Sequence, residues 1–164
     1  MQPPPAAPQL EVLLDSPLWT GAPAAQGLMR RALAEAAHAL SPGADGELCV
    51  VLTDDAAIRS LNRTWRGIDA PTNVLAFPAK ASTHPVTHLG DIVIAYETAQ
   101  AEAAAAAKPL GDHVAHLALH GFLHLLGYDH QADEEATQME QLERVLLARL
   151  GIGDPYGPAP DLHG

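Results

Sequence analysis

The chain has 164 residues, and 48% of them are hydrophobic, which fits a single folded domain and excludes a largely disordered protein. Nine Lys plus Arg against 20 Asp plus Glu give a net charge of -11, so any contact with RNA must be local, because the overall field disfavours nucleic acid. With only two Trp, three Tyr and two Phe, base stacking is expected to contribute little to such a contact.

The pattern of apolar runs and of Pro and Gly breakers predicts one domain over residues 9–152, with flexible ends at 1–8 and 153–164. The first four expected elements are a strand at 10–14, a helix at 23–40, a strand at 47–52 and a helix that Thr53, Asp54 or Asp55 caps and that runs to about 65. The other five are a short extended piece at 74–77, a central strand at 91–96 and helices at 97–107, 112–126 and 131–150.

Two details of these elements are also expected. Cys49 is interpreted as a buried small hydrophobe rather than a reactive thiol. The last helix is amphipathic, and its inner face is predicted to consist of Met139, Leu142, Val145, Leu146 and Leu150. Strands and helices mix without strict alternation.

Histidines are concentrated on the predicted helix at 112–126. His120 and His124 lie one helical turn apart, so both imidazoles can reach one ion. Gly127 can end the helix in the left-handed conformation and turn the chain so that His130 returns to the same point. The spacing H-x-x-x-H-x-x-G-x-x-H is that of a known zinc motif. Three imidazoles and an open fourth position predict a catalytic zinc site.

The other histidines receive weaker interpretations. His116 is expected to support or pack against the site rather than to be a ligand, and Asp129 either orients a ligand or is solvated at the turn. His113, His84 and His88 are interpreted as surface or loop residues. Inert, half-buried histidines on an apolar helix are the alternative to a metal site.

The residue after His120 is Gly121, whereas zinc peptidases of the H-E-x-x-H type have a glutamate there as general base. A peptidase mechanism would therefore need another carboxylate.

Three of the nine basic residues, Arg59, Arg63 and Arg66, lie within eight positions on or just after the second predicted helix. They could bind phosphate oxygens of RNA. For Arg59 and Arg63 a solvated helix face is an equally good interpretation.

The segment 66–78, Arg-Gly-Ile-Asp-Ala-Pro-Thr-Asn-Val-Leu-Ala-Phe-Pro, together with Leu-Gly-Asp-Ile-Val-Ile at 89–94 and the histidine motif, resembles the YbeY family of bacterial endoribonucleases. The resemblance runs from about Leu48 to the Asp-Pro-Tyr at 154–156, and Ala76 departs from it because the family often has serine there. It implies a small α+β domain with a mixed sheet of about four strands and a zincin-like helix. It also implies one zinc ion bound by His120, His124 and His130, with Arg66 as the functional arginine beside it.

The family resemblance further implies maturation of small-subunit ribosomal RNA and ribosome quality control, with the small ribosomal subunit, a ribosomal protein and an Era-like GTPase as partners. We therefore expect a zinc-dependent, single-strand-specific endoribonuclease. The alternatives are a zincin-like metallopeptidase and a non-catalytic ribosome assembly factor whose zinc is structural. No stretch reaches the ~20 apolar residues of a membrane span, and residues 1–8 lack the basic and apolar segments of a signal peptide. A cytoplasmic location without membrane contact is expected.

Overall fold

A mixed four-stranded sheet forms the centre of the computed structural model, which describes residues 9–40, 46–79, 88–128 and 133–156. The strands are β1 (Gln9–Leu14), β2 (Glu47–Thr53), β3 (Val74–Pro78) and β4 (His88–Ala95). Their order in the sheet is β1-β2-β4-β3; β1, β2 and β4 are parallel, and β3 runs antiparallel to β4 at the edge. The expected α+β fold with a small mixed sheet is confirmed.

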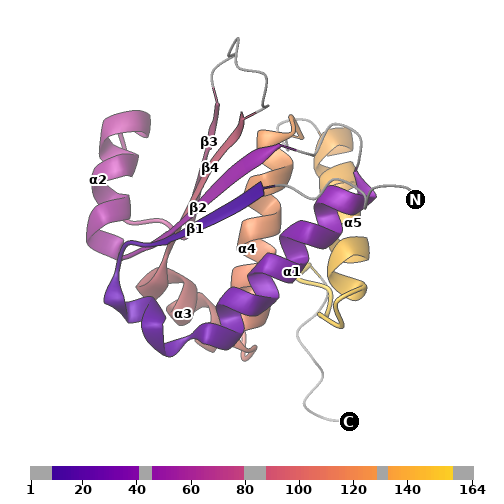
Figure 1. Ribbon diagram of the computed structural model, residues 1–164, viewed down its shortest axis with the longest axis horizontal. Coiled ribbons are helices and arrows are strands. Elements are labelled where there is room, and N and C mark those ends of the chain that lie inside the picture. Colours follow the sequence, from indigo (N-terminus) through magenta and orange to yellow (C-terminus); the bar gives the residue numbers. More distant parts are fainter. Residues whose placement is uncertain (1–8, 41–45, 80–87, 129–132, 157–164) are drawn as a thin grey trace.

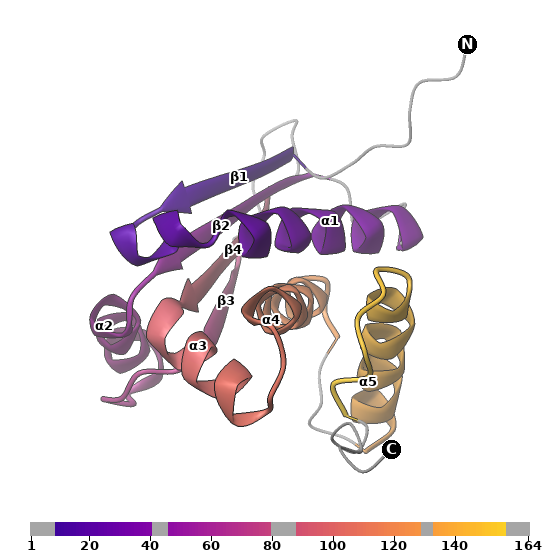
Figure 2. The same cartoon turned by 90° about the horizontal axis from the view of Figure 1, so that it is seen from below.

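Helices cover both faces of this sheet. They are a short 3-10 helix, η1 (Pro17–Gly21), and five α-helices: α1 (Pro23–Ala39), α2 (Asp55–Arg66), α3 (Tyr96–Ala105), α4 (Leu110–Leu125) and α5 (Asp133–Ala148). Figure 1 shows α1 and α4 on one face of the sheet and α2 on the other. In Figure 2, α5 packs beside α4 on the side away from α2. No helix within the described residues is long and apolar enough to cross a membrane.

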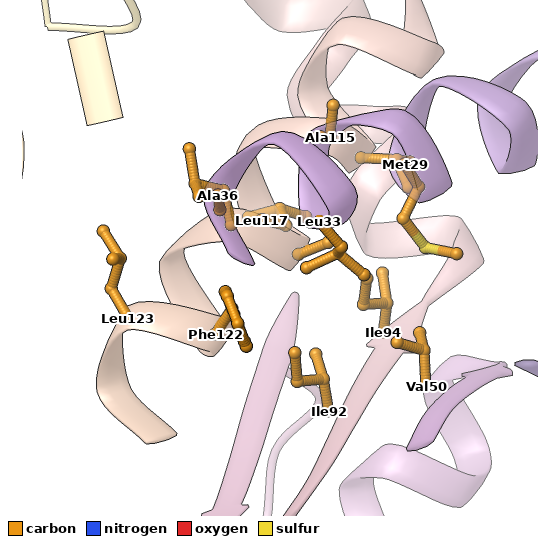
Figure 3. Close-up of a cluster of buried hydrophobic side chains, with 14 of the residues drawn as sticks. Met29, Leu33, Ala36, Val50, Ile92, Ile94, Ala115, Leu117, Phe122 and Leu123 are labelled. Atoms are coloured by element: carbon orange, nitrogen blue, oxygen red, sulfur yellow. The ribbon is translucent and has the colours of Figure 1, made fainter. Parts of the chain in front are cut away.

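The main core lies between the sheet and the layer formed by α1 and α4. Helix α4 contacts the sheet, α1, α3 and α5, and it therefore needs apolar side chains around most of its circumference. Figure 3 shows side chains from α1, the sheet and α4 meeting in this core, among them Leu33, Ile92 and Phe122, which are fully buried. Burying such side chains contributes about 1.5–3 kcal/mol each. This packing makes α4 a rigid support for whatever its exposed side carries.

Local interactions fix the ends of α2. Asp54 caps it as expected, since its Oδ1 accepts a hydrogen bond from the Ala57 backbone N at 2.9 Å. The Asp55 side chain accepts hydrogen bonds from the backbone N and the hydroxyl of Thr98, which ties α2 to α3. At the other end, Gly67 has φ +72° and its backbone N donates to the Arg63 carbonyl at 3.1 Å, which ends the helix directly after Arg66.

Two expectations about burial are corrected. Cys49 is half-buried rather than buried, because it lies on the face of β2 that α2 covers only in part. On α5, Val145 is 41% exposed, whereas Glu143 and Leu147 take buried positions of the inner face. The tail at 153–156, expected to be part of a flexible end, contacts α5: Asp154 accepts a hydrogen bond from Arg144 Nε at 3.0 Å. Residues 1–8 and 157–164 lie outside the described residues.

Candidate metal and RNA cleavage site

Two of the three predicted ligands meet in one cleft. His120 and His124 lie one turn apart on α4 and line an open cleft of about 580 Å³ between α4 and the edge strand β3. Their Nε2 atoms are 3.1 Å apart. Two imidazole nitrogens that share a tetrahedral zinc ion, each about 2.0 Å from it, lie about 3.3 Å from each other. The pair thus has nearly the separation that one shared ion requires.

The third predicted ligand, His130, and the neighbouring Asp129 lie outside the described residues. The turn that leads to them is described. Gly127 has φ +98°, the left-handed conformation expected at the end of the helix, and its backbone N donates to the His124 carbonyl at 3.0 Å. Among the described residues no three His, Cys, Asp or Glu side chains form a group that could hold a metal ion.

A buried carboxylate fixes the orientation of His120. Glu143 on α5 has no exposed side-chain surface, and its Oε1 lies 2.6 Å from His120 Nδ1. An ionised carboxylate can only accept hydrogen bonds, so the Nδ1 atom carries the proton. In the neutral ring, Nε2 is then the acceptor nitrogen, and it lies within hydrogen-bond distance of His124 Nε2, at 3.1 Å. This arrangement of carboxylate and histidine is typical of zinc sites, in which it sets the tautomer of the ligand.

The second oxygen of Glu143 is also occupied. Tyr156 donates its hydroxyl proton to Glu143 Oε2, and His116 Nε2 lies 3.4 Å from the same oxygen and 3.3 Å from the tyrosine hydroxyl. The tail thereby reaches back to the site, since Arg144 holds Asp154 and lies over the Tyr156 ring. His116 is therefore placed beside Glu143, in the supporting position expected of it.

The electrostatics of Glu143 follow from these contacts. Burial alone would raise the pKa of its carboxyl, but the hydrogen bonds with His116, His120 and Tyr156 outweigh burial and lower the pKa to about 2. The pKa of the Tyr156 hydroxyl is raised, because of burial and then because of its hydrogen bond to this carboxylate. Glu143 is therefore ionised at neutral pH and accepts three hydrogen bonds.

The packing of α4 against the sheet explains why a glycine occupies position 121. A Cβ atom at this position would lie 3.1 Å from Ile92 Cγ2 and 3.5 Å from Val74 Cγ2, so a side chain here would require Ile92 to shift by a few tenths of an ångström. The glutamate of H-E-x-x-H peptidases would therefore fit at this position only with a local shift of the sheet side chains. Ala76, where the resemblance leads us to expect serine, lies in the wall of the same cleft.

The three arginines of the basic segment differ in their position relative to the cleft. Arg66, in the last turn of α2, lines the cleft with His120 and His124, whereas Arg59 and Arg63 are not among its lining residues. Arg59 Nε donates to Asp69 Oδ1 at 2.8 Å, and this hydrogen bond lowers the pKa of the Asp69 carboxyl. Arg59 is thus occupied by a neighbouring loop residue. The structure brings only Arg66 to the histidines.

The interpretation of His113 as a surface or loop residue is wrong. His113 is 8% exposed, and its Nε2 lies 2.8 Å from Glu102 Oε1; burial lowers the pKa of its imidazole. The same carboxylate accepts a hydrogen bond from Asn73 Nδ2 at 3.0 Å, and Asn73 lines the cleft. His113 and Glu102 therefore support the segment that enters β3. His88 is exposed at the start of β4, and His84 lies outside the described residues.

Sequence reasoning missed Glu143 and the contacts of Tyr156. One pattern could have indicated the first: Glu143 follows Met139 by four residues and precedes Leu146 by three, so it shares their buried helix face. A carboxylate on a buried face needs a partner, and the histidine cluster is the natural candidate.

Comparisons with known proteins agree with this architecture. The family model described as Endoribonuclease YbeY matches residues 20–151. A protein named Endoribonuclease YbeY from Nitrobacter hamburgensis is 52% identical over 94% of this chain and 85% of its own length. The protein of that name from Bradyrhizobium diazoefficiens is 49% identical over 97% of this chain and 91% of its own.

A solved structure supports the fold independently. The solution structure of a Thermotoga maritima protein covers 92% of this chain and 100% of its own with a TM-score of 0.58 at 21% identity. At that identity the likeness concerns the fold alone. The sequence relatives decide the assignment: this chain belongs to the Endoribonuclease YbeY family.

Proposed function

We propose that the protein is a single-strand-specific endoribonuclease that uses one zinc ion held by His120, His124 and His130 and that matures small-subunit ribosomal RNA. The observation that carries the proposal is the pair of histidine Nε2 atoms 3.1 Å apart in an open cleft that Arg66 also lines. Family membership supports the endoribonuclease activity. Zinc is the metal that three imidazoles and an open position suit.

The chain's own residues prepare this site. Glu143 holds the proton on His120 Nδ1, so Nε2 is the nitrogen with the lone pair, and it would exchange its contact with His124 for the metal without a change of tautomer. Tyr156 and His116 occupy the other carboxylate oxygen and keep Glu143 from reaching into the cleft itself. When bound, zinc would supply a Lewis acid for a phosphoryl oxygen and an activated water.

Arg66 serves the substrate. Its guanidinium is exposed at the end of α2 and borders the cleft, where it can bind the phosphate whose charge increases in the transition state. In a chain with a net charge of -11, such a local cation offsets the repulsion of RNA by the overall field.

The two alternatives lose support. A peptidase needs a general base beside the metal, but the residue after His120 is Gly121, and both oxygens of Glu143 are engaged with other side chains. A structural zinc would need a fourth protein ligand. His116, the candidate for that role, has its Nε2 atom at Glu143 and Tyr156 instead.

The biological setting follows from the family resemblance and is part of the proposal: a cytoplasmic role on the small ribosomal subunit, including ribosome quality control, beside a ribosomal protein and an Era-like GTPase. The acidic surface of this chain suits a basic ribosomal protein as partner.

Metal analysis paired with RNA cleavage tests the proposal. Purified protein should contain one zinc per chain and cleave single-stranded ribosomal RNA fragments. A chelator should abolish cleavage, and added zinc should restore it. Cleavage that survives complete removal of metal would overturn the proposal.

The ends of the products distinguish two routes. A 2′,3′-cyclic phosphate would show that the ribose 2′-hydroxyl attacks phosphorus, whereas its absence from the first products would show attack by water.

A further inference from the structure

Trp65 is an exposed aromatic residue that the proposed function leaves without a role. It precedes Arg66 in the last turn of α2, and 69% of the residue is exposed. The other tryptophan, Trp19, is fully buried and donates its indole N–H to the Thr53 carbonyl at 2.8 Å. The chain thus places one of its two largest aromatic side chains in solvent, where it gains little from the hydrophobic effect.

The Trp65 ring lies beside the strand that forms the cleft wall. It contacts Phe77 of β3 edge-on, with ring centroids 6.1 Å apart and an interplanar angle of 62°. Phe77 packs with the apolar cluster under α2, where Trp65 borders a shallow hollow with Leu61 and Val93. Its strand neighbours Ala76 and Pro78 line the cleft, so Trp65 lies around the edge of β3 from the cleft. One aromatic contact therefore orients Trp65 at the sheet edge, and the next residue, Arg66, reaches into the cleft.

The charges around Trp65 favour a nucleic acid as its ligand. Arg63 and Arg66 flank it in the last turn of α2, and both are exposed. Within the part of the chain that the structure describes, neither forms an ion pair, whereas Arg59 is paired with Asp69. Exposed guanidinium groups near an exposed aromatic ring are a combination by which proteins hold single strands, because phosphates bind the cations and bases stack on the ring.

We propose that Trp65 is a stacking platform for one unpaired nucleobase of single-stranded RNA, next to the phosphate that Arg66 binds. The proposal rests on the proposed function, because it takes the cleft to be the RNA cleavage site. It also limits the expectation that base stacking contributes little: one base stacks here, and the strand gains affinity at this point without a strict sequence preference.

Tryptophan fluorescence tests the platform directly, because Trp19 is buried and only Trp65 is accessible to a base. Metal-free protein would be titrated with a 2′-O-methyl oligonucleotide, which cannot form a cyclic phosphate, and with an abasic strand that has the same number of phosphates. We expect saturable quenching by the strand with bases and none by the abasic strand.

Variants separate stacking from charge. Trp65→Ala should weaken binding of the strand with bases by about 5- to 150-fold, the effect of losing one stacked base, and leave binding of the abasic strand unchanged. Trp65→Phe should restore most of the affinity. Leu18→Ala, at another exposed apolar side chain, is the matched control and should bind like the wild type.

Several results of these binding experiments would overturn the platform. Equal binding by Trp65→Ala and the wild type, an equal loss for both strands, or no binding of either strand to the wild type would overturn the platform. So would a Trp65→Ala variant that binds RNA normally but no longer binds small ribosomal subunits, because Trp65 would then contact a protein. Quenching without cleavage by the zinc-loaded protein would contradict the proposed function and leave the platform standing.

Discussion

The two sides of the cleft are built in opposite ways. On the α4 side, His120 is held by Glu143, which is fully buried and in turn contacts His116 and Tyr156. On the α2 side, Arg66 is exposed in the last turn of a helix and has no ion pair within the described residues.

This difference separates two tasks. A metal ligand has to keep its orientation and tautomer before the ion arrives, which requires a supporting shell of hydrogen bonds. A group that binds a flexible polyanion gains from solvent access and can adjust as the strand enters. We therefore expect substitutions on the histidine side to change metal binding, and substitutions on the arginine side to change only the handling of RNA.

The largest effect is expected from His124→Ala on the histidine side. One imidazole would be lost from a three-ligand site, so both zinc retention and RNA cleavage should fall to background. Zinc content and cleavage would be measured on the same preparation. His88→Ala, at an exposed histidine on β4, is the matched control. Zinc content equal to that of the wild type would remove His124 from the ligand set.

Arg66→Glu should affect the other side alone. Zinc content and thermal stability should match the wild type, while cleavage should fall by about 100-fold or more, because a cation facing the transition state is replaced by an anion. Arg31→Glu, at an exposed position of α1, carries the same charge change elsewhere and controls for the overall field. Zinc loss in Arg66→Glu would break the proposed separation of the two sides.

Glu143→Gln tests the supporting shell and should have an intermediate effect. The amide keeps the shape of the side chain but replaces a charged acceptor of the hydrogen bond from His120 Nδ1. We expect zinc affinity, measured by competition with a chelator, to fall by about 10- to 100-fold. Glu134→Gln, in the exposed first turn of α5, should bind zinc like the wild type. An unchanged affinity in Glu143→Gln would show that the carboxylate only fills space.

The smallest effect is expected from Arg59→Ala. Arg59 pairs with Asp69 at the surface, with both side chains about half exposed, and exposed pairs contribute little to stability. Cleavage and the unfolding midpoint should both stay close to those of the wild type. A loss of cleavage comparable to that of Arg66→Glu would show that Arg59 does bind RNA.

The sequence was sufficient for features that depend on local periodicity. The histidine pair on α4, the Asp54 cap and the left-handed Gly127 are each set by residues within one or two turns. The four strands were also expected near their observed positions, because short apolar runs between breakers mark them.

Features that depend on distant contacts could not be derived in this way. Glu143 meets His120 across 23 positions and Tyr156 meets His116 across 40, so no local pattern joins them. His113 is buried because α3 brings Glu102 against α4, which depends on how the helices pack. The separation of Arg59 from Arg66 likewise depends on where the loop after α2 places Asp69.

X-ray absorption at the zinc edge of the loaded protein tests the central claim most directly, because it counts the ligands of the ion. Three imidazole nitrogens with one or two oxygen ligands from solvent are predicted, and His130→Ala should reduce the imidazole count to two. Four protein ligands around the zinc, or an imidazole count of three that His130→Ala leaves unchanged, would contradict a three-histidine site with an open position.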